Sequence, residues 1–166
     1  MNLTSGLVLP GKSNNCEKSE KEKNVKSEQA RLLIGYWLGT VPSPDITDVE
    51  KRRKIKNEEI QDKLRNGEMV YGVTHFTPAM YLQYELTRIK LDYTVYKGET
   101  LGGYPCRVFS ETDLRQYYDN NRDLFTRYFG DSFGFEEVAM IIEKRLKEKE
   151  YEDIVKDLLC KHEEWK

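Results

Sequence analysis

The sequence predicts a mainly α-helical fold of four to five helices around a central helix, with a short extended pair or hairpin. Apolar residues recur at helical spacing in several long segments, and recognisable start and stop residues bound these segments. A cluster of glycine and proline turn residues separates the third helical segment from the fourth. The 38% hydrophobic content is enough for a core, while the 34% of charged residues indicates a large solvated surface.

The chain begins with a polar stretch that predicts a flexible arm. Residues 12–27 are almost entirely Lys, Ser, Asn and Glu, with one Val and one Cys. Such a composition does not bury enough apolar area to offset the entropy that is lost on ordering. We therefore expect residues 1–27 to form a flexible polar N-terminal arm and residues 28–166 to form a single helical domain.

Two helices are expected after this arm. The first begins at Glu28, and the apolar residues within 32–38 point in every direction around it, which predicts burial on all sides. A glycine and two prolines then end this helix. A second helix is expected over residues 46–65, where sparse apolar residues predict one narrow buried stripe. Asn66 and Gly67 are its stop signal.

The third helix is the predicted centre of the fold. Thr77 is an expected N-cap and Pro78 suits the first turn, so the helix begins there and continues to about Asp92. The preceding residues 68–76 are expected to be extended. At 100° per residue the helix carries two apolar stripes on nearly opposite sides, which predicts that it lies between two packing partners. One stripe contains Met80, Tyr84 and Leu91, and the other contains Leu82, Leu86, Ile89 and Tyr93.

The remaining chain predicts a loop or short hairpin and two further helices. Residues 93–109 contain several Gly and Pro turn residues. Ser110 and Asp113 then form a capping-box pattern that starts the fourth helix. In the long last helix, residues 135–161, the apolar face moves to nearly the opposite side across residues 147–150. We expect this helix to be a strut that contacts different neighbours on its two faces; a kink at the charged segment is the alternative.

No residue pattern in the chain indicates a catalytic group, a metal site or a cofactor. The motifs of zinc proteases, serine hydrolases and nucleotide-binding loops do not occur. The three cysteines are too widely spaced for a zinc site. His75, next to Phe76, is interpreted as a structural histidine, and a small enzyme that uses His75 with nearby carboxylates is the alternative. The net charge of −2 argues against a nucleic-acid partner.

The chain is rich in aromatic residues, with 11 Tyr and 6 Phe. Tyrosine combines an apolar ring with a polar tip, so it suits binding surfaces as well as cores. We predict that a group of these residues lines a groove for unfolded or extended polypeptides, and core packing is the alternative for each of them. The candidate peptide-binding residues are Phe76, Tyr81, Tyr84, Tyr93, Tyr117, Tyr118 and Phe125.

One segment resembles a known family. Residues 109–121, Phe-Ser-Glu-Thr-Asp-Leu-Arg-Gln-Tyr-Tyr-Asp-Asn-Asn, followed by Phe125, resemble the helical part of extracytoplasmic foldases of the SurA/PrsA type. Residues 135–151 are similar to the C-terminal helix of that family, and residues 67–86 are similar to its Gram-positive members. The resemblance implies a chaperone. It does not imply prolyl isomerase activity, because only about nine residues separate Phe125 from Phe135, where the family carries its parvulin domain.

The sequence therefore predicts a chaperone-like or foldase-like domain that binds polypeptides and performs no chemistry. A structural or regulatory interaction domain without client-holding activity is the alternative. The resemblance implies a location in the cell envelope, outside the cytoplasm, if a signal peptide lies upstream; otherwise a cytoplasmic location is expected. No transmembrane segment is expected, because the longest apolar run, residues 30–38, is about half as long as a membrane span.

Overall fold

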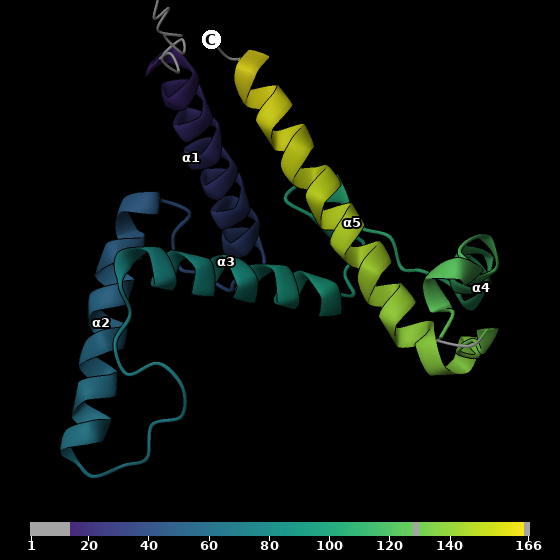
Figure 1. Cartoon of the computed structure of the whole chain (residues 1–166). Helices are drawn as coiled ribbons and strands as arrows, with labels where there is room; N and C mark the ends of the chain where they lie inside the picture. Colours follow the sequence, from purple (N-terminus) through teal and green to yellow (C-terminus); the bar gives the residue numbers. More distant parts are fainter. Residues whose placement is uncertain (1–13, 128–129, 165–166) are drawn as a thin grey trace, which may run out of the picture.

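The computed structural model describes residues 14–127 and 130–164. In chain order, its elements are α1 (Asn14–Trp37), α2 (Ile46–Arg65), α3 (Pro78–Val95), β1 (Thr100–Leu101), β2 (Tyr104–Pro105), α4 (Glu111–Asn120), the 3-10 helix η1 (Arg122–Phe125) and α5 (Phe135–Glu164). The two short strands form an antiparallel hairpin. The predicted mainly helical fold with a short hairpin is confirmed (Figure 1).

The helix α1 begins earlier than the sequence predicts. The expected start is Glu28, whereas the helix begins at Asn14. The additional turns are rich in Lys and Glu, which have high helix propensity and stabilise a helix when they lie four residues apart, as Glu22 and Lys26 do. Local propensity rather than burial therefore favours helix in the described part of the predicted arm. Residues 1–13 of that arm lie outside the described residues.

The large lobe is built around α3, which packs against α1, α2 and α5. In Figure 1, α3 crosses beneath α1 and α5. Thr77 caps its N-terminus by accepting a hydrogen bond from the main-chain N–H of Met80, and Pro78 occupies the first turn, as predicted. The prediction that the third helix is central is therefore confirmed. The buried side chains of α3 in this core are Tyr81, Leu86, Ile89 and Tyr93.

The helix α5 belongs to two lobes at once. Its first half packs against α4 and η1 in a small lobe. Its second half contributes Tyr151, Ile154 and Val155 to the core of the large lobe. These two sets of buried residues lie on opposite faces of one uninterrupted helix, so the predicted strut is confirmed. The buried residues of the small lobe are Phe125, Phe135, Val138 and Ile142.

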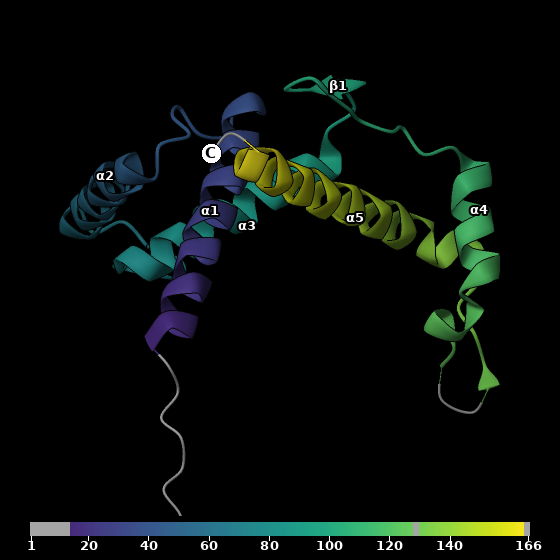
Figure 2. The same cartoon turned by 90° about the horizontal axis from the view of Figure 1, so that it is seen from above.

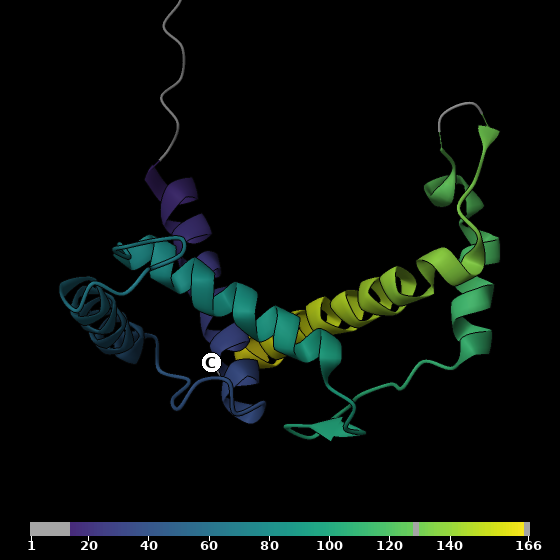
Figure 3. The same ribbon diagram turned by 90° about the horizontal axis from the view of Figure 1, so that it is seen from below.

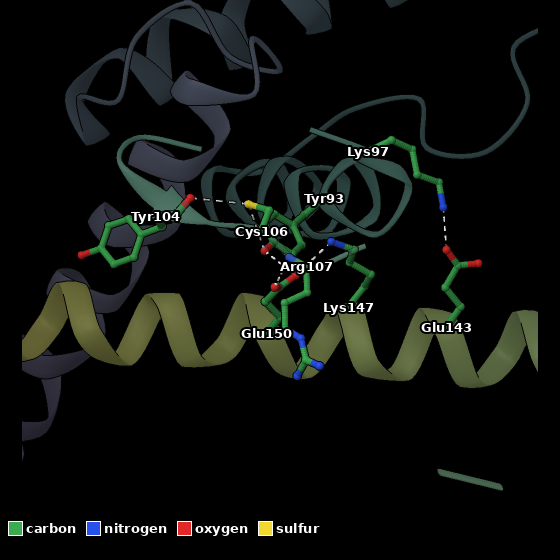
Figure 4. A network of polar contacts seen from close by, with 8 residues as sticks. All are labelled: Tyr93, Lys97, Tyr104, Cys106, Arg107, Glu143, Lys147 and Glu150. Atoms are coloured by element: carbon green, nitrogen blue, oxygen red, sulfur yellow. Dashed lines mark hydrogen bonds and ion pairs between the residues drawn. The ribbon is translucent and has the colours of Figure 1, made fainter. Parts of the chain in front are cut away.

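The change of face in α5 coincides with a buried ion pair. Lys147 is 1% exposed and donates a 2.9 Å hydrogen bond to Glu150. Glu150 also accepts hydrogen bonds from the Tyr93 hydroxyl of α3 (2.9 Å) and from the main-chain N–H of Arg107 (2.7 Å), as Figure 4 shows. Burial raises the pKa of the Tyr93 phenol, so that it remains a proton donor. One carboxylate thus joins α5, α3 and the chain that leaves the hairpin.

The two lobes together form an open arch. Seen from above, α5 extends from the large lobe to α4, and the small lobe stands apart from α3 (Figure 2). The arch therefore leaves the side of α3 that faces away from α1 and α5 without cover from the small lobe.

None of the helices in the described part of the chain has the length and apolarity that a membrane crossing requires.

Leu86→Ala is expected to lower the free energy of unfolding by about 2–5 kcal/mol, because it leaves a cavity in the core of the large lobe. Leu91→Ala is the matched control, since Leu91 lies on the opposite, exposed side of the same helix. Its effect is expected to stay within about 0.5 kcal/mol. Urea unfolding followed by circular dichroism measures both changes. Equal effects would contradict the assignment of the two faces.

Glu150→Ala is expected to lower the free energy of unfolding by about 3–5 kcal/mol, because it leaves the buried ammonium of Lys147 without a partner. The neighbouring Glu148→Ala serves as the control. The hydrogen bonds of the network join Glu150 to Lys147, Tyr93 and the main chain of Arg107 and do not include Glu148, so a change within about 0.5 kcal/mol is expected. The same unfolding measurement applies. A Glu150→Ala protein as stable as the Glu148→Ala protein would show that the ion pair does not hold the junction.

Candidate protein-binding site

One face of α3 is apolar and yet exposed. Met80, Tyr84 and Leu91, which form one of the two predicted stripes, are 40–47% exposed. From below, α3 lies in front of α5 and α1, and no other helix crosses over it (Figure 3). The sequence-based expectation that both faces of this helix are packed is therefore correct for one face only. Within the described part of the chain, no helix covers this second face.

The segment that joins α2 to α3 forms a second wall beside this face. Together the two walls enclose an open groove of about 760 Å³ with a mostly apolar lining. Arg88 and Asp92, an ion pair one turn apart, lie at its polar edge. We call this feature the α3 groove. Its apolar residues are Tyr71, Val73, Phe76, Met80, Tyr84 and Leu91.

Side chains of α2 hold this second wall in place. The buried amide of Asn57 accepts a hydrogen bond from the main-chain N–H of Phe76 (2.7 Å) and donates one to its carbonyl (3.0 Å). Arg53 donates to the same carbonyl (2.8 Å), and Gln61 donates to the carbonyl of Thr74 (3.3 Å). Since a paired main chain is costly to displace, these bonds fix the wall before any partner arrives.

A buried ion pair fixes α2 to α3 behind the groove. Arg52 donates two hydrogen bonds of 2.7 Å to the two carboxylate oxygens of Glu85, and both side chains are largely buried. This bidentate geometry is the strongest form of a side-chain ion pair. Burial and the adjacent charge of Glu85 raise the pKa of the Tyr81 phenol, which therefore stays uncharged at neutral pH. The Arg52–Glu85 ion pair thus fixes the position of α2 relative to α3 behind the groove.

Three of the seven predicted binding aromatics meet at the start of α3. The rings of Phe76, Tyr81 and Tyr84 form a cluster with centroids 5.3–5.9 Å apart. Phe76 and Tyr84 line the α3 groove, whereas Tyr81 is buried behind them. Two of these three predicted residues therefore lie in the groove lining, and their role in binding stays a prediction.

The other four predicted aromatics lie elsewhere. Tyr93 is buried at the junction of α3 with α5, and Phe125 is buried in the core of the small lobe, so neither is accessible to a peptide. Tyr117 and Tyr118 are half-buried against the small lobe. The expectation that all seven line one groove does not hold, because the two lobes bury their aromatics separately.

The structure places His75 differently from the prediction. Its side chain is exposed in the loop before α3, so the interpretation as a packed structural histidine is wrong. Within residues 14–127 and 130–164, no group of three or more His, Cys, Asp or Glu side chains is arranged to hold a metal ion.

Sequence reasoning missed the role of Asn57. A usable signal was present, because Asn57 lies on the narrow stripe of α2 that buries Val49 and Ile60. A polar side chain on a buried stripe needs a hydrogen-bonding partner. The stripe predicts that Asn57 needs a partner. It does not identify that partner, because the main chain of Phe76 is 19 residues away in the sequence.

Similar proteins include a named chaperone. The chain is 26% identical over 131 residues to a protein of Bifidobacterium longum subsp. longum named "Chaperone for lacto-N-biosidase", covering 79% of this chain and 45% of that relative. No known family model matches. The described fold is mainly helical, and a protein similar to it carries a chaperone's name.

The fold is also similar to part of a solved enzyme structure. It matches the GH136 lacto-N-biosidase from Eubacterium ramulus with a TM-score of 0.73 and 32% identity, over 81% of this chain and 27% of that chain. A selenomethionine derivative of the same protein gives a TM-score of 0.73 and 33% identity. The chain thus spans less than half of the curated relative and about a quarter of the solved chain.

These similarities support the broader part of the resemblance drawn from the sequence and leave its finer part unsupported. Neither relative is named as a foldase of the SurA/PrsA type, and neither supports that family or its prolyl isomerase. The broader class is supported, since the curated relative is a chaperone. The local pattern around Ser110 is a helix start with aromatic anchors, and such a start recurs in unrelated helical proteins.

Asn57→Ala is expected to loosen the second wall of the groove, because it removes the acceptor of the Phe76 main-chain N–H and one of the two donors to the Phe76 carbonyl, which leaves Arg53 as the remaining donor. We expect a loss of about 1–3 kcal/mol in the free energy of unfolding and faster amide exchange at Phe76. Gln61→Ala is the matched control, since this amide makes one exposed 3.3 Å bond to the same loop. An amide exchange rate at Phe76 that is the same in Asn57→Ala as in the unchanged protein would show that Asn57 does not hold the Phe76 main chain.

Proposed function

We propose that this chain is a chaperone-like helper that binds a glycoside hydrolase of the lacto-N-biosidase type, and that the α3 groove is the surface that holds it. The observation that carries the proposal is the exposed apolar face of the central helix. An apolar helix face that its own chain leaves uncovered is typical of a protein-interaction site. The partner of this face completes the packing that the sequence of α3 predicts.

The names of the similar proteins support the choice of partner. One relative is a chaperone for lacto-N-biosidase, and a similar fold makes up about a quarter of a chain in a lacto-N-biosidase structure. A fold that occurs both in a helper and within an enzyme chain is expected to contact the rest of that enzyme. We therefore place the catalytic chemistry in the partner and assign binding to this chain.

A rigid groove favours a folded or folding enzyme over a random unfolded chain. Asn57 and the Arg52–Glu85 pair hold both walls of the groove before binding. Preorganised walls lower the entropic cost of association with one matching surface. The proposal therefore narrows the predicted unfolded or extended polypeptide partners to a particular client.

A complementation experiment tests the proposal. The E. ramulus lacto-N-biosidase chain is expressed without the quarter that matches this fold, and the present chain is supplied as a separate polypeptide. We expect soluble, active enzyme to be recovered only when both are present. If the enzyme remains insoluble or inactive with this chain, while its complete form is active, the proposed function is wrong.

Matched surface variants assign the effect to the groove. Met80→Ser with Leu91→Ser removes two apolar side chains from the α3 groove, and we expect complex formation to weaken roughly tenfold. Met140→Ser with Leu124→Ser changes the same residue types at exposed positions outside the groove and is expected to bind normally. Circular dichroism checks that both proteins fold. If the two variants bind equally well, the interface does not include the α3 groove.

A further inference from the structure

We propose that residues 69–73, which belong to the second wall of the α3 groove, act as a docking edge for a β-strand of the partner. The partner strand pairs its main chain with this segment and places its inward side chains against α3. The inference rests on the proposed function and specifies how the partner is recognised. It requires unpaired main-chain groups, side chains that line the groove and fixed ends, each of which the segment has.

The main chain of residues 69–73 is unpaired within the described structure. The main-chain bonds of this region stop at Glu68, whose N–H bonds to Lys63, and resume at Thr74 and Phe76. Unpaired N–H and C=O groups in a row are what a strand edge offers to another chain. Five residues correspond to an ordinary strand length.

The segment has exposed side chains, two of which face the groove. Met69, Tyr71 and Val73 are exposed, with Met69 at 75% and Tyr71 at 86%, while Val70 between them is half-buried. Tyr71 and Val73 also line the α3 groove. A partner strand that pairs with this edge therefore lies over the α3 groove, and every second side chain of that strand points into the groove.

Gly72 leaves room for a second main chain. It adopts φ +92°, and a side chain at this position would meet nothing within 4 Å. A glycine of this kind within an extended segment marks a bulge or a close approach by another backbone. Gly72 thus leaves open space beside the segment for the main chain of the partner strand.

Both ends of the segment are fixed before binding. At the start, Gly67 with φ +72° and Glu68 close the end of α2, with bonds from Gly67 to Leu64 (3.1 Å) and from Glu68 to Lys63 (2.9 Å). At the other end, Asn57 clamps Phe76. A short edge held at both ends loses little entropy on pairing, which favours strand addition.

A helix from the partner fits these observations less well. A helix satisfies its own main-chain groups internally, so it would leave the N–H and C=O groups of residues 69–73 unpaired at the interface. A strand pairs with them and still buries the exposed face of α3. The geometry therefore points to an extended occupant.

Hydrogen exchange on the purified complex with the shortened E. ramulus chain tests the inference. Alternate amides within residues 70–73 are expected to exchange rapidly in the unbound protein and at least about tenfold more slowly in the complex, because adjacent N–H groups of a strand point to opposite sides. A complex that forms while these amides keep their rapid exchange would overturn strand addition and leave the proposed function intact. The absence of any complex would overturn both.

Proline substitutions supply a second readout, because proline removes one main-chain donor. Adjacent N–H groups of a strand point to opposite sides, so only one of Val70→Pro and Tyr71→Pro is expected to remove a pairing donor. That variant is expected to bind at least about tenfold more weakly than the alanine variant of the same residue. If proline and alanine are equivalent at both positions, the segment binds through its side chains alone.

Discussion

The arrangement of the molecule depends on the change of face in α5 at the Lys147–Glu150 ion pair. Before this pair the helix buries residues in the small lobe, and after it the opposite face enters the large lobe. Glu150 also binds α3 and the chain that follows the hairpin, so the angle between these parts is set at one carboxylate. Because α5 is continuous, the small lobe is held away from α3 and does not cover its second apolar face.

Features that depend on neighbouring residues could be predicted from the sequence. The N-cap at Thr77, the capping box at Ser110 and the face change in α5 follow from local chemistry and helical periodicity, and all three are present. Periodicity also predicted two packing faces for α3. It did not indicate that the second face is left open, because a stripe of apolar residues is the same whether its cover comes from the same chain or from another.

The candidate site could be predicted only in part for the same reason. Tyr81 and Tyr84 are three residues apart on one helix, yet one is buried and the other lines the groove. Aromatic content alone does not separate these environments. The wall of the groove depends on the contact of Asn57 with Phe76, which joins two segments across the fold. The early start of α1 was missed because a solvated helix carries no apolar stripe.

The proposed function gives the open face a physical purpose. When a helper lies within the same chain as its client, the linker supplies a high effective concentration, and a weak interface is sufficient. A helper that acts as a separate chain lacks this contribution and needs more buried apolar area or more main-chain pairing. The α3 groove supplies the first and residues 69–73 supply the second. Both belong to walls that Asn57 and the Arg52–Glu85 pair hold in place, so association does not first require the binding surface to order.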